Sequence, residues 1–190
     1  MSGNLEFVER NGVSLIRHQA DFGDAFRKKM QANNGTGCFT GIVGPGGGKT
    51  LAGSYCLSLA MQEFEIDTCV VVAPTTIIRQ SWPKDASLFG VRLSTDVNNR
   101  RIIQQKIAGE LDGFAVTYQA VASFPELYRK LTHDNNVCVS FDEIHHLSDN
   151  QAWGDAAKFA FEHAKIVISL SGTPFRTDAN NIPFLEYRYD

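Results

Sequence analysis

The chain has 190 residues, 43% of them hydrophobic, which is enough for one continuous core, so we expect a single globular domain. Its formal net charge of -3 excludes an overall basic surface, so any contact with nucleic acid must come from a local patch or from another domain. Because the N-terminus is polar and no apolar run reaches the roughly 18 residues of a membrane span, we expect a cytoplasmic protein without membrane contact.

Short apolar runs rich in β-branched residues alternate with stretches of helical periodicity along the chain. This alternation predicts βαβ crossovers and therefore an α/β fold with a mainly parallel sheet flanked by helices. The predicted strands are Cys38–Val43, Thr68–Ala73, Phe114–Tyr118, Val137–Phe141 and Ile166–Leu170. The predicted helices are Lys49–Phe64, Asn99–Leu111, Ala120–Leu131 and Asn150–Ala164.

Unusual residues follow the predicted strands at the points where the strands end. In doubly wound sheets, ligands bind beyond the carboxyl ends of the strands, so we expect these segments to converge on one edge of the sheet. The segments are Gly44–Thr50, Pro74–Thr76, Asp142–His145 and Ser171–Arg176.

The segment Gly44-Pro-Gly-Gly-Gly-Lys-Thr50 lies between a predicted strand and a predicted helix. The loop begins at Gly44. The backbone N–H groups of Gly46, Gly47 and Gly48 can surround phosphate oxygens, and the N-terminus of the following helix adds its positive dipole end. The Lys49 ammonium would reach the β- and γ-phosphates, and the Thr50 hydroxyl would bind Mg²⁺. The strict motif has glycine where this chain has Val43, and a glycine-rich turn with an incidental Lys-Thr pair is the alternative.

Asp142 and Glu143 follow the predicted strand Val137–Phe141. Asp142 would hold Mg²⁺ directly or through water, while Glu143 would orient and deprotonate the water that attacks the γ-phosphate. The alternative for such a pair is a solvated strand end.

Five segments resemble the motifs of superfamily 2 DExH-box helicases and translocases, and they occur in the order of that family. They are Leu15–Gln19, Pro74–Trp82, Val116–Gln119, the box Asp142-Glu-Ile-His145 and Ser171-Gly-Thr-Pro174. The Thr-Tyr-Gln and Ser-Gly-Thr-Pro-Phe-Arg forms are closer to the branch of restriction-enzyme motor subunits and excision-repair helicases than to DEAD-box RNA helicases.

This resemblance implies that residues 1–176 form the N-terminal RecA-like motor domain, with ATP and Mg²⁺ as its cofactors. Residues 177–190 would begin an extension or linker towards a second RecA-like domain, which would supply the arginine that stabilises the transition state. The implied partner is nucleic acid, with DNA favoured over RNA.

The resemblance also implies roles for single residues around the nucleotide. The Gln19 amide would pair with adenine, although an ordinary residue on a helix surface is the alternative. His145 would hydrogen-bond towards the third motif, where Ser171 and Thr173 would couple hydrolysis to the nucleic-acid side. His146 has no such precedent, and Arg176 could contact phosphate or form a surface ion pair.

Short polar side chains at two strand ends are suited to grip backbone phosphates without distinguishing bases. These candidate nucleic-acid ligands are Thr75, Thr76, Arg79, Thr117 and Gln119. Trp82, Trp153 and the phenylalanines lie in apolar periodic stretches, so we expect them to be core residues and not stacking platforms.

The four cysteines lie far apart in apolar stretches, without the paired spacing of a zinc site or a disulfide scaffold. We therefore expect Cys38, Cys56, Cys69 and Cys138 to be buried, reduced thiols.

Two rival functions use the same fold. A regulatory or assembly ATPase would hydrolyse nucleotide without moving along nucleic acid, and the Pro74-Thr-Thr and Thr-Tyr-Gln segments argue against it. A catalytically silent scaffold would not need Lys49, Thr50, Asp142 and Glu143 together.

Overall fold

The computed structural model describes residues 6–44, 46–96, 110–172 and 183–184. In chain order, the elements are β1 (Phe7–Arg10), β2 (Val13–Ile16), α1 (Arg17–Ala32), β3 (Gly37–Ile42), α2 (Lys49–Glu63), β4 (Thr68–Ala73), α3 (Thr76–Leu88), β5 (Leu93–Ser94), β6 (Gly113–Thr117), α5 (Tyr118–Ser123), α6 (Pro125–Asp134), β7 (Val137–Asp142), α7 (His146–Asp149), α8 (Gln151–Phe161) and β8 (Ile166–Ser171).

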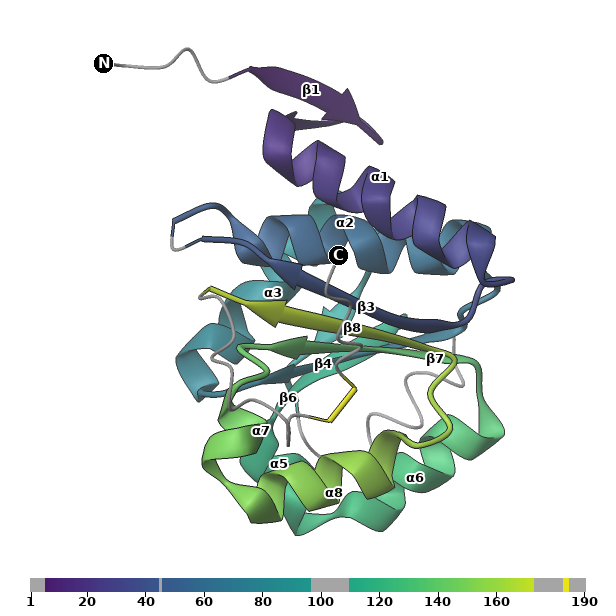
Figure 1. Ribbon diagram of the computed structural model, residues 1–190, viewed down its shortest axis with the longest axis vertical. Coiled ribbons are helices and arrows are strands. Elements are labelled where there is room, and N and C mark those ends of the chain that lie inside the picture. The colour runs from purple at the N-terminus through teal and green to yellow at the C-terminus, as the bar shows by residue number, and fades with distance from the viewer. Residues whose placement is uncertain (1–5, 45, 97–109, 173–182, 185–190) are drawn as a thin grey trace.

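Six of these strands form one parallel sheet in the order β3-β8-β7-β4-β6-β5 (Figure 1). Strands β4, β7 and β8 are buried along their whole length, as expected for a sheet that is covered on both faces. The order places β8 between β3 and β7, so the segments that follow these three strands lie side by side. The predicted α/β fold with a parallel sheet flanked by helices is confirmed.

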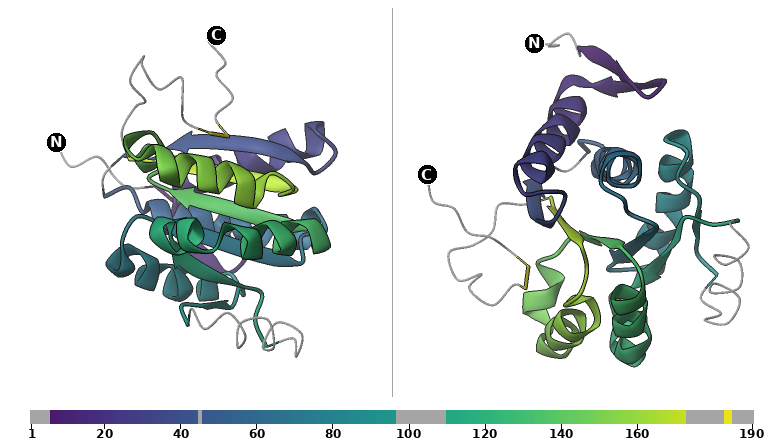
Figure 2. Two further views of the ribbon diagram at one scale, coloured as in Figure 1. Left: turned by 90° about the horizontal axis from the view of Figure 1, so that it is seen from below. Right: turned by 90° about the vertical axis from the view of Figure 1, so that its right-hand side faces the viewer.

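Helices cover both faces of the sheet in a three-layer arrangement (Figure 2). Helices α1, α2 and α3 lie on one face, over an apolar cluster that includes Phe26, Tyr55 and Trp82. Helices α5 to α8 lie on the other face, over a cluster that includes Tyr118, Phe141 and Phe161. The sheet is therefore packed between two apolar clusters, and the segments after its strands begin at its carboxyl edge.

A two-stranded antiparallel hairpin, β1 and β2, precedes the sheet and was not predicted. Its turn is Asn11-Gly12, and both residues have positive φ, of 50° and 75°. This backbone suits the two-residue turns that match the twist of hairpin strands, and glycine and asparagine adopt it at little cost. The hairpin leads directly into α1, which carries Gln19 to the phosphate loop.

The predicted helix Ala120–Leu131 is wrong as one element, because the structure has α5 and α6 with a break at Phe124. Pro125 cannot donate a helical N–H, so it occupies the first position of a new helix. Residues 99–109 of the predicted helix Asn99–Leu111 lie outside the described residues. Helix α3 was not predicted as an element, and α8 ends at Phe161 after the separate short helix α7.

Cys56, Cys69 and Cys138 are buried, as predicted, whereas Cys38 is half-buried. Burial raises the pKa of the Cys56 and Cys138 thiols, so these side chains stay protonated. Within the described part of the chain, no helix is long and apolar enough to cross a membrane.

Candidate functional site

The phosphate loop connects β3 to α2, and its glycines adopt backbone conformations that other residues avoid. Gly46 and Gly48 have φ of +75° and +68°, and Gly48 is the residue that caps the N-terminus of α2. The Gly47 N–H donates to the Gly44 carbonyl over 2.9 Å, which closes a tight turn. Lys49 is therefore the first residue of α2, with Thr50 beside it at the positive end of the helix dipole.

Val43, where the strict loop motif has glycine, continues the strand pairing. Its N–H donates to the Ser171 carbonyl over 3.0 Å, and its side chain is buried with 5% exposure. A buried apolar side chain at this position joins the loop to the end of β8. The departure from the strict motif thus has a packing reason.

Two side chains from the start of α1 contact the loop from outside. Gln19 is 5% exposed, and its amide nitrogen donates to the Gly47 carbonyl over 3.0 Å. The His18 Nε2 atom lies 2.9 Å from the same carbonyl. The Gln19 amide oxygen accepts the Ile16 N–H over 3.2 Å. Gln19 is thus not an ordinary surface residue, whereas its adenine contact stays a prediction. No sequence signal pointed to His18.

Lys49 meets both carboxylates of the acidic motif. Its ammonium lies 3.5 Å from Asp142 Oδ1 and forms a hydrogen-bonded ion pair with Glu143 Oε1. The Lys49 side chain is 18% exposed and that of Asp142 is 1% exposed. The phosphate loop and the acidic motif, 94 residues apart in the chain, therefore form one site.

Asp142 lies at the buried end of β7, where two aromatic residues hold it. The Trp82 indole N–H donates to Asp142 Oδ2 over 3.0 Å, and the Tyr118 hydroxyl donates to the Asp142 backbone carbonyl over 2.9 Å. Burial raises the pKa of Asp142 above its usual value, although the Trp82 hydrogen bond and the Lys49 charge oppose the shift. Trp82 is fully buried, as predicted, but its polar contact with the acidic motif was not anticipated.

Asp142 Oδ1 is buried and accepts no hydrogen bond from the residues that the structure describes. Its nearest cation is the Lys49 ammonium, 3.5 Å away, so the oxygen has an ion-pair partner but no hydrogen bond. Such an oxygen suits a metal ion or metal-bound water, because a buried lone pair without a hydrogen bond is costly. The Asp142 carboxylate and the Thr50 hydroxyl are oxygen ligands of the kind that Mg²⁺ prefers.

Glu143 adopts a backbone conformation with φ of +54°, which is unfavourable for a residue with a side chain. Its Oε2 accepts the Gly172 N–H over 2.9 Å, which ties the acidic motif to the segment after β8. Burial acts to raise the pKa of Glu143, but the hydrogen bonds from Lys49 and Gly172 and the Lys49 charge outweigh it and lower the pKa. Glu143 is therefore held as a carboxylate that faces the phosphate loop.

His145 connects the acidic motif to the third motif. Its Nδ1 lies 3.3 Å from the Ser171 hydroxyl and 3.4 Å from Glu143 Oε2. The neighbouring His146 is half-buried, and its ring lies against those of Tyr118 and His145. The predicted contact between His145 and Ser171 is present, whereas Thr173 and Arg176 lie outside the described residues.

A groove of about 280 Å³ lies between α3 and α5 beside this site. Thr76, Arg79, Thr117 and Gln119, all candidate nucleic-acid ligands, line it. Thr117 also caps α5, because its hydroxyl oxygen accepts the Ala120 N–H over 3.2 Å. A capping hydroxyl uses its oxygen as acceptor and keeps its hydrogen for a further acceptor such as phosphate.

Thr75 lies apart from the other candidate ligands. It lines a neighbouring hollow of about 460 Å³ together with Pro74, Glu143, His145 and other residues. Its hydroxyl caps α3 by accepting the Ile78 N–H over 3.3 Å. The hollow is lined by Glu143 and by Thr75, which precedes the groove residue Thr76 in the chain, so the candidate nucleotide site and the groove are neighbours.

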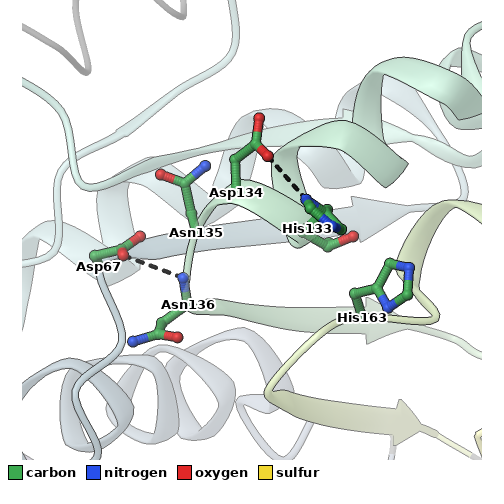
Figure 3. Close-up of a pocket in the computed structure, with 7 residues that line it drawn as sticks. Asp67, His133, Asp134, Asn135, Asn136 and His163 are labelled. Atoms are coloured by element: carbon green, nitrogen blue, oxygen red, sulfur yellow. Dashed lines mark hydrogen bonds and ion pairs between the residues drawn. The ribbon is translucent and has the colours of Figure 1, made fainter.

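A further pocket of about 380 Å³ opens at the amino ends of β4, β7 and β8 (Figure 3). Asp67 accepts the Asn136 backbone N–H over 3.1 Å there, and His133 contacts Asp134 over 2.9 Å. The described part of the chain holds no group of three His, Cys, Asp or Glu side chains placed to bind a metal. This pocket is at the opposite edge of the sheet from the phosphate loop and takes no part in the candidate site.

Residues 12–176 match the family model described as the res subunit of type III restriction enzymes. The chain belongs to this family. Membership confirms the expected relationship to the N-terminal motor domains of superfamily 2 helicases.

Curated relatives are longer than this chain. An uncharacterised protein of Mycobacterium tuberculosis is 37% identical over 155 residues, which are 80% of this chain and 25% of that protein. An uncharacterised protein of Mycobacterium leprae is 34% identical over 152 residues, again 80% and 25% of the two chains. The chain thus spans about a quarter of the length of the curated relatives that it matches.

Two solved structures share the fold. The SWI2/SNF2 ATPase core of Sulfolobus solfataricus, solved in complex with double-stranded DNA, gives a TM-score of 0.71 at 22% identity over 91% of this chain and 36% of that one. The Hef helicase domain of Pyrococcus furiosus gives 0.58 at 19% identity, over 85% and 36%. These similarities identify the fold as RecA-like.

Proposed function

We propose that this chain is the first motor domain of an ATP-dependent helicase or translocase that moves along nucleic acid, with DNA as the favoured substrate. The contact of Lys49 with Asp142 and Glu143 carries the proposal, because a phosphate-binding lysine, a metal-binding carboxylate and a general base come together there. Membership of the family and the fold shared with a SWI2/SNF2 ATPase core and a helicase domain support it.

In this proposal, Lys49 binds the β- and γ-phosphates of ATP at the N-terminus of α2, and the backbone N–H groups of Gly46, Gly47 and Gly48 surround the phosphate oxygens. Thr50 and Asp142 would hold Mg²⁺, which when bound neutralises charge on the phosphate oxygens. Glu143 exchanges its ion pair with Lys49 for a water molecule and accepts the proton of that water.

The contacts around Glu143 also supply a route for coupling. Glu143 contacts Gly172, and His145 contacts both Glu143 and Ser171, so a change at the base alters the start of the segment after β8. Thr173, in that segment, is proposed to take part with Ser171. Backbone phosphates of the nucleic acid would bind next to these coupling contacts. The proposed ligands are Thr75, Thr76, Arg79, Thr117 and Gln119.

The test is steady-state ATP hydrolysis by the longest natural protein that contains this chain, with and without single-stranded and duplex DNA and RNA. We expect nucleic acid, and DNA most, to raise turnover at least severalfold. A turnover rate that none of the four nucleic acids changes would favour a regulatory or assembly ATPase.

A Glu143→Gln variant tests the base within the same assay. The amide keeps the shape and can still accept the Gly172 N–H, but it cannot take the proton of water, so hydrolysis should fall by about 10²- to 10⁴-fold. ATP binding should persist, because Lys49 loses a competing carboxylate. Glu9→Gln, at an exposed carboxylate on β1, is the matched control and should behave as the wild type. Hydrolysis by Glu143→Gln at the control rate would exclude Glu143 as the base.

A further inference from the structure

Phe124 is a large aromatic side chain in an unusual position. It is 57% exposed, whereas Phe26, Phe141 and Phe161 lie in the core. It forms the corner between α5 and α6 and lies on the wall of the groove that holds Thr76, Arg79, Thr117 and Gln119. The expectation that the phenylalanines are core residues is therefore wrong at this position.

The corner holds Phe124 rigidly. The Phe124 N–H donates to the Val121 carbonyl over 3.2 Å, and its own carbonyl accepts the Leu127 N–H over 3.1 Å. Pro125 follows at the first position of α6, where its ring fixes the backbone. Because the backbone is fixed, no backbone ordering is needed at this corner to keep the ring at the groove wall on binding.

The rest of the groove suits an anion. Arg79 is the charged residue of its lining, beside the hydroxyls of Thr76, Thr117 and Ser123, and the lining contains no carboxylate. The Arg79 Nε atom is buried and has no hydrogen-bond partner among the residues that the structure describes. Burial raises the pKa of Tyr128, which also lines the groove, to about 12, so its hydroxyl carries no negative charge near neutral pH.

We propose that the groove binds one nucleic-acid strand by its phosphate at Arg79, Thr76 and Thr117 while Phe124 stacks on an unpaired base of the same strand. This inference rests on the proposed function and adds to it a preference for single-stranded nucleic acid. The ligand must carry both a negative charge and a flat apolar face, since the groove offers a guanidinium and an exposed ring side by side. An unstacked nucleotide has both.

The preference for single-stranded nucleic acid follows from the accessibility of the base faces. In a duplex, both faces of each base are covered by its neighbours, so a side chain that touches the backbone cannot reach a base face without unstacking it. In a single strand, base faces are accessible, and stacking on an aromatic side chain contributes binding that tolerates any sequence. Arg79 therefore contributes to binding of both single-stranded and duplex nucleic acid, whereas Phe124 contributes only to binding of the single strand.

The test measures dissociation constants by fluorescence anisotropy for a single-stranded oligonucleotide and a hairpin duplex of equal length. It uses the longest natural protein that contains this chain. We expect Phe124→Ala to weaken single-strand binding by about 5- to 100-fold and to leave duplex binding within about twofold. Phe124→Trp should keep the wild-type preference. Arg79→Ala should weaken binding of both nucleic acids.

Phe7→Ala is the matched control, because Phe7 is also an exposed phenylalanine, at 61%, but lies on β1 away from the groove. It should not change binding of either nucleic acid. An abasic oligonucleotide provides a second measurement. It should bind the wild type as weakly as the normal oligonucleotide binds Phe124→Ala, and it should bind both proteins alike.

The outcomes separate the inference from the proposed function. If Arg79→Ala weakens binding while Phe124→Ala does not, or weakens single-strand and duplex binding equally, the stacking role is wrong and the motor function stands. If Phe124→Ala binds normally but loses nucleic-acid-stimulated ATP hydrolysis, Phe124 contacts a protein surface instead, which also overturns the inference. If the wild type binds neither nucleic acid, both proposals fail.

Discussion

Lys49 lies between Asp142 and Glu143 and neutralises part of their charge, so its removal affects more than phosphate binding. Without Lys49, Asp142 keeps a buried charge, and among the residues that the structure describes the Trp82 indole is the remaining donor to its carboxylate. A buried carboxylate that loses its cation is costly. The same ammonium therefore stabilises the site before ATP binds and binds the phosphates afterwards.

Lys49→Ala is expected to weaken binding of Mg-ATP by at least about 30-fold, because hydrogen bonds between charged groups each contribute about 1.5–3 kcal/mol. Titration with a fluorescent ATP analogue measures the loss. Lys130→Ala, at an exposed lysine on α6, is the control and should bind as the wild type does. An unchanged affinity of Lys49→Ala for Mg-ATP would show that this loop is not the phosphate-binding loop.

Asp142→Asn is expected to stabilise the fold near neutral pH while it impairs Mg-ATP hydrolysis. Because burial raises the pKa of Asp142, the folded chain holds this proton more tightly than the unfolded chain does. The corresponding stabilisation is present below the unfolded pKa and is lost as pH rises through the folded pKa. An asparagine does not ionise, so it avoids that loss.

Thermal unfolding of Asp142→Asn and wild type from pH 4 to pH 8 measures this effect. The unfolding temperature of the variant relative to the wild type should increase with pH, by about 2–4 °C for each kcal/mol relieved. A difference that stays constant or decreases as pH rises would contradict the role of burial at Asp142.

At the scale of elements, close contact between α1 and α2 positions Gln19 and His18 against the phosphate loop. Gly23 of α1 makes this approach possible, since a Cβ atom there would lie 2.2 Å from the Tyr55 ring. Tyr55 is fully buried and stacks on Phe89 with ring centroids 5.5 Å apart, so it cannot move aside freely.

Gly23→Ala is therefore expected to have two opposing effects on the free energy of unfolding, a gain in helix propensity and a loss from overpacking. Alanine favours a helix by up to about 1 kcal/mol over glycine, whereas an overfilled core costs about 1–3 kcal/mol. We expect packing to dominate and the unfolding temperature to fall by about 2–6 °C. In a Tyr55→Leu background, Gly23→Ala should lower the unfolding temperature by less. Equal costs in the two backgrounds would show that the Tyr55 ring is not the obstacle.

At the scale of the whole molecule, the chain corresponds to about a quarter of the curated relatives, and the proposed motor needs a second RecA-like domain. Phosphoryl transfer depends on charges arranged around the γ-phosphate, and an arginine from a second element contributes about 10³- to 10⁵-fold in rate. The site that Lys49, Asp142 and Glu143 form supplies one side of that arrangement.

Residues 1–190 alone are therefore expected to bind Mg-ATP weakly and to hydrolyse it slowly, with or without DNA. Nucleic acid stimulates a two-domain motor by closing the domains over the nucleotide, which one domain cannot do. Steady-state hydrolysis by the 190-residue chain beside the longest natural protein checks this. Strong stimulation of the short chain by DNA would mean that it completes the site by itself or with a second copy.

The sequence alone predicted the strands β3, β4, β6, β7 and β8 to within a residue or two, because buried parallel strands are continuous apolar runs. It also predicted that the phosphate loop and the acidic motif meet, since the carboxyl ends of parallel strands share one edge. Those inferences need only local composition and chain order. The catalytic, metal-binding, adenine-binding, coupling and nucleic-acid-binding roles of the candidate residues all stay predictions.

Contacts between distant segments were decided by the tertiary structure. Trp82 and Asp142 are 60 residues apart, and an apolar pattern around Trp82 indicates burial without naming the group that its indole N–H meets. The exposure of Phe124 depends on where Pro125 ends one helix and starts another, and on which wall of the groove that corner faces. Periodicity records whether a side chain is apolar, but only the packing of elements determines which side chains remain uncovered.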